Sequence, residues 1–302
     1  MTRYSSTTID AIKGGSAMGR QEEDSVQNTS FDIYGNALDQ TITKTYYDSD
    51  GVTTLLGNTE YMKIANTFDS RNRVSASVID NYPDSTFSAL SLVTEKIVSY
   101  SGYDDYSNAT DQTIKTYIGK DRVFSTLETI HSDFGADPAQ RMKGNAVTRT
   151  VSKYSDEAAA ALVTRSVINT TSFDSFGNPL VQDSVTSRSS GAGMVDIRVT
   201  HTVNLTFDSA GNALTQQVTT YSALDPSKAI SYELVTNLSF DSNHNVTSQI
   251  VLTYTKESGV FVSAKEIRYD GFDSTGTPIK EYIATYQKDD LSDTPNVTVV
   301  FN

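Results

Sequence analysis

Apolar and polar residues alternate in short runs along the chain. In the run 202–208, the apolar residues Val203, Leu205 and Phe207 occupy odd positions, and polar residues occupy the even ones. The run 214–219 alternates in the same way after a short polar stretch. A period of two is typical of half-buried β-strands. The segment therefore predicts a β-hairpin whose buried face carries Leu205 and Phe207, with Asn204 on the polar face.

The same hairpin pattern returns along the chain. Its anchor is an aromatic residue beside an Asp, and successive anchors lie 31 to 39 residues apart. The eight anchors are Phe31, Phe68, Tyr103, Phe134, Phe173, Phe207, Phe240 and Phe272. A fixed period of about 34 residues indicates a repeat array.

The turn between the two strands of each unit has its own chemistry. Asp208 can accept hydrogen bonds from the backbone that follows it, and Gly211 supplies a positive φ. Glycine recurs at Gly35, Gly177 and Gly276, whereas Asn72 and His244 replace it with residue types that tolerate the left-handed region. The calcium-binding alternative, for these turns and for DSDG at 48–51, is weaker because Asp and Gly already have a turn-making role.

A tyrosine closes the second strand of most units. It lies 14 or 15 residues after the anchor at Tyr46, Tyr82, Tyr117, Tyr221, Tyr254 and Tyr286. The fourth unit differs, since Tyr154 comes 20 residues after Phe134, which predicts an insertion at 135–144. Only 155–163, SDEAAAALV, has a helical composition.

These patterns predict an all-β fold. We expect residues 1–302 to form a single repeat array of tandem antiparallel β-hairpins, about eight units of ~34 residues, with a partial unit at each end near Tyr4 and Phe301. Up to 17 strands would then form one continuous twisted, coiling sheet, shell-like or solenoid-like. The ends also suggest a segment of a longer array, although atypical capping units are an alternative.

Composition excludes several classes. Hydrophobic residues make up only 37% of the 302 residues and Trp is absent, which argues against a thick core. The net charge of -13 argues against nucleic acid and against anionic membrane surfaces as partners, and we expect no membrane insertion. The absence of Cys excludes disulfides and thiolate chemistry.

Candidate chemistry is sparse. His131, His201 and His244 fall at different positions in the repeat, which gives no reason for a shared metal or catalytic site. We therefore predict no catalytic, cofactor-binding or metal residues, no cofactor, and no enzymatic activity.

Two groups of amides have alternative interpretations. Gln residues lie nine positions after their anchors and either form a hydrogen-bonded ladder or line a ligand-binding row: Gln40, Gln112, Gln182, Gln216 and Gln249. Glycosylation sequons begin at Asn28, Asn108, Asn169, Asn204, Asn237, Asn245 and Asn296. Asn on the polar face of a strand explains these without modification.

The stretches FDIYGNAL (31–38), FDSFGNPL (173–180) and FDSAGNAL (207–214) resemble the YD repeats of Rhs and teneurin-type proteins, with a longer repeat period here. In that family, hairpins wind into a large β shell of secreted toxins and cell-surface proteins. The resemblance implies a secreted or cell-surface RHS-like scaffold, spacer or shell.

We therefore expect a structural or adhesive segment of a large secreted or cell-surface repeat protein, whose neighbours are further repeats of a longer chain. The first alternative is a module that binds an extracellular glycan or protein through Tyr-rich linker loops. The connections between hairpins, such as 222–229, vary in length and composition, and surface loops often carry binding function. The second alternative is an outer-membrane β-barrel, which the absence of Trp disfavours.

Overall fold

The computed structural model describes residues 2–4, 20–47, 54–191, 193–241, 244–255, 259–272 and 278–301. The chain divides into two compact units, Met1–Ser132 with Val151–Val163, and Asp133–Thr150 with Thr164–Asn302. The described residues form 18 strands, one short α-helix and one 3-10 helix. This confirms the all-β class and the tandem hairpins, and the strand beyond the 17 expected is the short one that ends at Tyr4.

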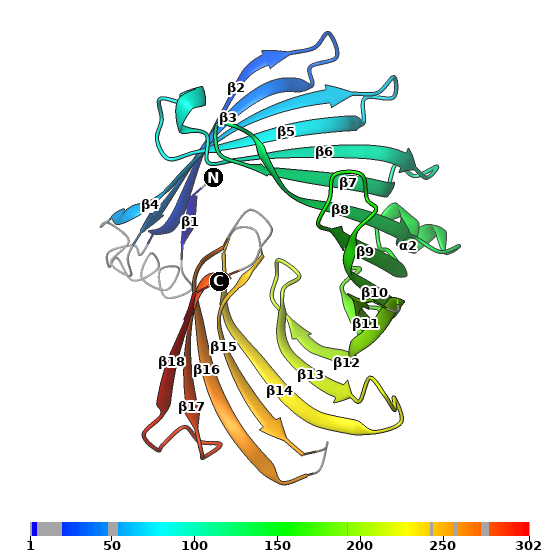
Figure 1. Cartoon of the computed structure of the whole chain (residues 1–302), viewed down its shortest axis with the longest axis vertical. Helices are drawn as coiled ribbons and strands as arrows, with labels where there is room; N and C mark the ends of the chain where they lie inside the picture. The colour runs from blue at the N-terminus through cyan, green and yellow to red at the C-terminus, as the bar shows by residue number, and fades with distance from the viewer. Residues whose placement is uncertain are drawn as a thin grey trace. The chain divides into compact units, whose positions relative to one another are not determined.

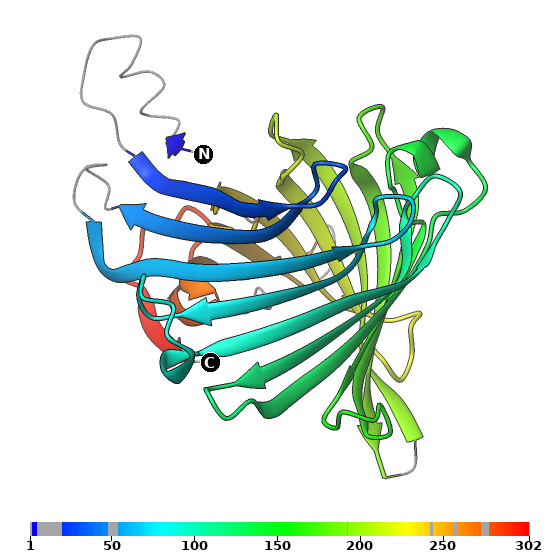
Figure 2. The same ribbon diagram turned by 90° about the horizontal axis from the view of Figure 1, so that it is seen from above.

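The first unit is built from strands that each pair antiparallel with their neighbours in sequence (Figure 1). In Figure 2 its blue to cyan strands lie side by side as a single layer. The strands are β1 Thr2–Tyr4, β2 Arg20–Phe31, β3 Ala37–Tyr47, β4 Thr54–Phe68, β5 Val74–Tyr82, β6 Thr94–Tyr103 and β7 Ala109–Ile118, and the 3-10 helix η1 spans Ala89–Ser91. Three strands contain the unit boundary, namely β8 Val123–Asp133, β9 Thr148–Tyr154 and β10 Leu162–Phe173.

The second unit repeats the same construction, and every strand again pairs antiparallel with the next in sequence. Its strands are β11 Pro179–Ser190, β12 Gly193–Phe207, β13 Ala213–Tyr221, β14 Ala229–Phe240, β15 Val246–Tyr254, β16 Phe261–Phe272, β17 Pro278–Tyr286 and β18 Asn296–Phe301. The hairpin repeat therefore runs through both units.

The predicted anchors mark the ends of strands. Seven of them are the last residue of the first strand of their hairpin, and Phe134 directly follows β8. Four of the six predicted tyrosines are the last residue of a second strand, as Tyr82 is of β5 and Tyr221 of β13, and Tyr46 and Tyr117 are the last residue but one of β3 and β7. The spacing in the sequence therefore located both strands of each unit.

The turns also form as the sequence predicts. Asp208 Oδ1 accepts hydrogen bonds from the backbone N–H groups of Ala210 and Asn212, at 2.8 and 2.9 Å, and its Oδ2 accepts one from Asn212 Nδ2 at 2.8 Å. Gly211 has φ +85°, and Asn72 and His244 have φ 60° and 64° in the equivalent turns. Both carboxylate oxygens of Asp208 therefore bind the turn itself. Gly276 and residues 48–51 lie outside the described residues.

The predicted burial of the β12 face was wrong. Leu205 is 48% exposed, whereas Asn204 is only 4% exposed. The reason is a β-bulge, because the register shifts between Asn204 and Thr206 and again before Phe207. An extra residue interrupts the alternation of side chains between the faces. The same shift occurs beside Asn28 and Asn237, where Leu238 is 53% exposed.

The packed interior is thin. The structure describes no large side chain that is fully buried, and buried polar residues are about as frequent as buried apolar ones. A single-layer sheet must satisfy these polar groups internally, because burying them unpaired is costly. The hydrogen bonds between strands, rather than a deep apolar core, therefore carry much of the specificity of this fold.

The predicted insertion exists, but the helix lies elsewhere than expected. The α-helix, α2, spans Pro138–Met142 inside the insertion, with Asp137 as its N-cap. Residues 155–161 instead form a turn, because the Asp156 carboxylate accepts hydrogen bonds from the backbone of Ala160 and Ala161. Side-chain capping of this kind competes with helix formation.

Candidate functional site

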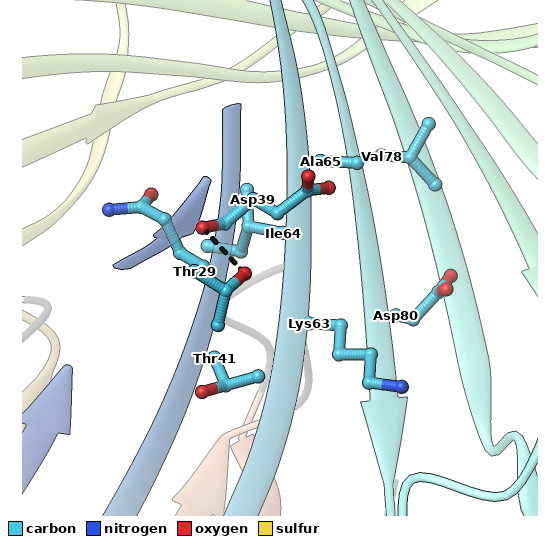
Figure 3. A pocket seen from close by; sticks show the side chains of 9 residues that line it. Thr29, Asp39, Thr41, Lys63, Ile64, Ala65, Val78 and Asp80 are labelled. Atoms are coloured by element: carbon cyan, nitrogen blue, oxygen red, sulfur yellow. Dashed lines mark hydrogen bonds between the residues drawn. The ribbon is translucent and has the colours of Figure 1, made fainter. Parts of the chain in front are cut away.

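A shallow groove lies on one face of the first unit, across β2 to β5 (Figure 3). The register places Thr41 opposite Lys63 and Lys63 opposite Asp80, so these side chains share a face. The groove has a volume of about 360 Å³ and combines hydroxyl, ammonium and carboxylate groups with small apolar side chains. Its lining is Thr29, Asp39, Gln40, Thr41, Lys63, Ile64, Ala65, Val78 and Asp80.

Asp80 is the perturbed carboxyl group of this groove. Burial raises the pKa of Asp80, and the Glu95 carboxylate, opposite it on β6, raises this pKa further. The Tyr82 hydroxyl donates to Asp80 Oδ2 at 3.3 Å, whereas Oδ1 is buried and has no hydrogen-bond partner among the described residues. Because Oδ1 is shielded from solvent, a ligand in the groove would have to displace its neighbours to bind it.

Lys63 is engaged by a linker. Its Nζ lies 4.9 Å from the centre of the Phe87 ring and 5.6 Å from that of Tyr82. Phe87 belongs to the linker 83–93 and meets the rings of Tyr61 and Tyr82 edge-on, with centroids 6.3 and 5.5 Å apart. Tyr82 is consequently only 9% exposed. This linker folds back over the tyrosine that closes the strand.

A second linker is held in the same way around Tyr117, which is also 9% exposed. The Arg122 guanidinium carbon lies 5.1 Å from the centre of the Tyr117 ring, and Arg122 also forms an ion pair with Glu95. The Tyr117 hydroxyl donates to Glu157 Oε1 at 2.6 Å, and Lys115 Nζ lies 3.1 Å from the same oxygen. The charges on this face therefore hold linkers against the sheet.

Two of the five Gln residues, Gln40 and Gln216, form hydrogen-bonded ladder segments in which Asn is the alternate member. Gln216 Nε2 donates to Asn204 Oδ1 at 2.6 Å, and Gln216 Oε1 accepts from Asn237 Nδ2 at 3.3 Å. Gln40 links Asn28 and Asn66 in the same manner. Asn and Gln alternate because each Gln lies on the second strand of its hairpin. The first strand of the next hairpin, which carries the Asn, therefore lies between one Gln and the next. Gln182 and Gln249 donate instead to Thr170 and Tyr269. In the part of the chain that the structure describes, Gln112 makes no such side-chain bond to Asn.

Sequence reasoning missed the tie that these Asn residues make between hairpins. Asn204 Nδ2 donates to the carbonyl of Pro179 at 2.7 Å, and Asn237 Nδ2 donates to that of Ala213 at 2.9 Å. Each acceptor lies six residues after the anchor of the preceding unit. The available signal was the spacing, because Asn204 and Asn237 both lie three residues before an anchor, although Asn66, which bonds the Ala37 carbonyl in the same way, lies two residues before its anchor.

The histidines each have a separate local partner. His131 Nδ1 lies 2.7 Å from Asp111, and His201 Nδ1 lies 2.7 Å from Asp183, in both cases across neighbouring strands. His244 Nδ1 lies 2.6 Å from Asn212 Oδ1 beside the adjacent turn. Among the residues that the structure describes, no group of three or more His, Asp or Glu side chains is arranged to hold a metal ion.

Several sequon asparagines are used by the fold. Asn204 and Asn237 are 4% and 5% exposed, so a glycan cannot be accommodated on them in the folded sheet. Asn108 and Asn245 each donate to the Asp of their own turn, at 3.0 and 2.9 Å. These contacts support the structural interpretation of the Asn residues.

Comparison with known proteins gives little more. No protein-family model matches the chain, and no curated protein matches it in sequence. A crystal structure of TcdB2-TccC3 without its hypervariable C-terminal region is similar over 92% of this chain and 19% of that one, with 10% identity and a TM-score of 0.18. The chain thus spans about a fifth of the length of that structure. In the described part, no helix is both long and apolar enough to cross a membrane.

Proposed function

We propose that this chain is a structural or adhesive segment of a large secreted or cell-surface repeat protein of the YD-repeat type, acting as a scaffold, spacer or shell. The observation that carries the proposal is the use of the recurring residues. The turn Asp binds the turn itself, an Asn two or three residues before the anchor binds the neighbouring hairpin in several units, and the closing Tyr packs against the linker. A repeat that uses its characteristic residues to join units suits an extended scaffold.

The linker-binding alternative finds less support. Tyr82 is covered by Phe87 of the linker that follows it, and Tyr117 by Arg122 of its linker and by Phe124 of β8. Tyr254 likewise meets Phe261 edge-on, at 5.9 Å between centroids. Rings that pack against their own linkers are not free to bind a partner.

Surface labelling of the source cells tests the proposed location. An antibody raised against the folded chain should stain intact cells, or detect the chain in the medium, and brief protease treatment of intact cells should remove the cell-bound signal. Staining that appears only after permeabilisation, with the chain protected from protease, would contradict an extracellular scaffold. A cytoplasmic protein of the same cells provides the permeability control.

A further inference from the structure

Strand β2 has an open edge next to the short strand β1. Within the described part of the first unit, residues 24–28 of β2 pair with β3 alone, because β1 reaches no further than Glu23. In Figure 2, β2 is the blue strand at the margin of this unit. Residues 25–29 are all exposed. Unpaired backbone groups at such an edge are a template for a further strand. We call residues 24–28 the β2 edge.

β1 pairs with β2 in the register that second strands use against the next hairpin. Tyr4 lies opposite Arg20, eleven residues before the anchor Phe31, and the register shifts just before the tyrosine. In the second unit, Tyr221 of β13 lies opposite Ala229 of β14, again eleven residues before the anchor and after the same shift. The three residues of β1 are therefore equivalent to the last three of β13.

In β14, the stretch equivalent to the β2 edge is covered. Residues 233–236 of β14 pair with 215–218 of β13, and Asn237 Nδ2 donates to the carbonyl of Ala213 at 2.9 Å. Val235 is 7% exposed there, whereas Val26, five residues before its own anchor like Val235, is 53% exposed. A strand on the β2 edge would thus bury apolar surface, which is favourable.

Asn28 carries the donor for the missing contact. Its Oδ1 accepts from Gln40 Nε2 at 2.6 Å, as Asn204 Oδ1 does from Gln216 Nε2. Among the residues that the structure describes, Asn28 Nδ2 has no acceptor, and Asn28 is exposed. Asn204 and Asn237, whose Nδ2 groups donate to the preceding hairpin, are 4% and 5% exposed. Asn28 therefore has half of the contacts that this position makes in the covered strands.

We infer that the β2 edge binds the second strand of a preceding hairpin of the same repeat, in the register that β1 begins. Such a strand presents to Asn28 Nδ2 the carbonyl that lies six residues after its anchor, and it covers Val26. A second folded copy of the chain does not offer this strand, because second strands such as β3 and β13 already pair on both sides. The inference rests on the proposed scaffold function, because it requires a further hairpin.

An extended form of the full chain tests the inference. The five residues ALTQQ, the sequence of 213–217, are placed directly before Met1, so that they continue β1 in the register of β13. Hydrogen–deuterium exchange of the amides of 24–28 should slow by roughly tenfold or more, because an added strand protects the edge. The melting temperature should rise by roughly 2–4 °C.

Two controls make the test specific. One additional Ser between ALTQQ and Met1 shifts the extension by one residue, which turns its side chains to the opposite faces, so we expect no protection. Asn28→Asp keeps an acceptor for Gln40 but has no donor. This substitution should leave the melting temperature of the unextended chain within about 1–2 °C of the parent value. In the extended chain, it should reduce the protection of 24–28 by roughly threefold or more.

The inference is overturned if the in-register extension slows exchange no more than the shifted one, or if Asn28→Asp leaves the protection unchanged. Sedimentation of the unextended chain gives a further check. A dimer whose formation protects 24–28 would assign the β2 edge to a second copy instead. Surface labelling tests the scaffold function separately, so an intracellular location and an edge that rejects the extension are distinguishable failures.

Discussion

The Asn204 side chain makes two hydrogen bonds that join neighbouring strands, which its predicted position on a polar face did not indicate. It accepts from Gln216, donates to the carbonyl of Pro179, and is 4% exposed. A side chain that satisfies two neighbouring strands while buried is costly to remove, because both partners lose a hydrogen bond. The leucine beside it lies in a bulge and is half exposed.

We predict that Asn204→Ala lowers the free energy of unfolding by about 1–3 kcal/mol, since Gln216 Nε2 and the Pro179 carbonyl lose their partner. Leu205→Ala, the adjacent control, should cost less than about 1 kcal/mol because Leu205 is 48% exposed. Urea unfolding followed by far-UV circular dichroism measures both. A larger loss of unfolding free energy for Leu205→Ala than for Asn204→Ala would contradict the observed burial and support the predicted arrangement, with Leu205 on the buried face.

Acid should destabilise the turns. A hydrogen bond from the Arg73 side chain, followed by one from the Arg73 backbone, lowers the pKa of Asp69 to about 2 from 3.8. A carboxyl group with a depressed pKa in the folded state stabilises it above the unfolded pKa. This contribution is lost as the pH falls from about 4 to about 2. Asp69→Asn should therefore reduce the slope of stability against pH in that window, as urea unfolding at several pH values would show.

Asp80→Asn provides a contrast, because the pKa of Asp80 is raised in the folded protein whereas that of Asp69 is lowered. Burial and Glu95 raise the pKa of Asp80, so its ionised form is unfavourable in the folded protein. We expect the substitution to leave stability at pH 7 unchanged or increased, and to remove a group whose protonation favours folding in acid. A clear loss of stability at pH 7 would show that the Asp80 charge is needed by Lys63.

Within a single hairpin, the turn is shaped by its own residues and also by the next turn. Gly35 and Gly211 both have φ +85°. A Cβ on Gly35 would meet nothing within 4 Å, whereas one on Gly211 would lie 2.7 Å from Asn178 Oδ1 of the neighbouring turn. A substitution at Gly35 therefore tests only the backbone conformation of the turn, whereas one at Gly211 also tests the packing between neighbouring hairpins.

We predict that Gly35→Ala costs about 1 kcal/mol, from backbone strain alone. Gly211→Ala should cost about 1 kcal/mol more, because Asn178 must move and is itself bonded to Asp174. Equilibrium unfolding of both variants beside the parent makes the comparison. Equal losses would mean that neighbouring turns do not support each other.

Across the whole molecule, stability should be distributed along the array, since each strand pairs with its neighbours in sequence. Deleting residues 207–239, so that residue 206 joins Phe240, removes one period. Asn204 then lies three residues before Phe240, as Asn237 does in the parent, and can meet Gln249 while keeping its bond to Pro179. The variant keeps every type of contact of the repeat.

We expect this deletion variant to be soluble and to unfold cooperatively with reduced stability, as nearest-neighbour arrays do. Equilibrium unfolding beside the parent is the measurement. A deletion that is one residue shorter, residues 207–238, shifts the following strand by one position and serves as the control. It should fold poorly because its side chains then point to the opposite faces of the sheet. Complete loss of folding in the in-register variant would indicate that strand number is fixed by closure of the sheet.

Local signals in the amino-acid sequence specify where strands and turns lie. The aromatic-Asp anchors, the Gly that allows φ +85° and the closing tyrosines are local signals, because turn geometry depends on residues a few positions apart. They gave the strand ends and the hairpin repeat.

Only the tertiary structure decided which side chains are buried. Alternation placed Leu205 inside and Asn204 outside, and the bulge reversed this, because a register shift depends on the partner strand. The sequence does not show that the strand-closing tyrosines are covered, yet Phe87 and Arg122 cover Tyr82 and Tyr117. Burial depends on contacts between strands that are distant in sequence. The alternation of polar and apolar residues within one short strand does not contain this information.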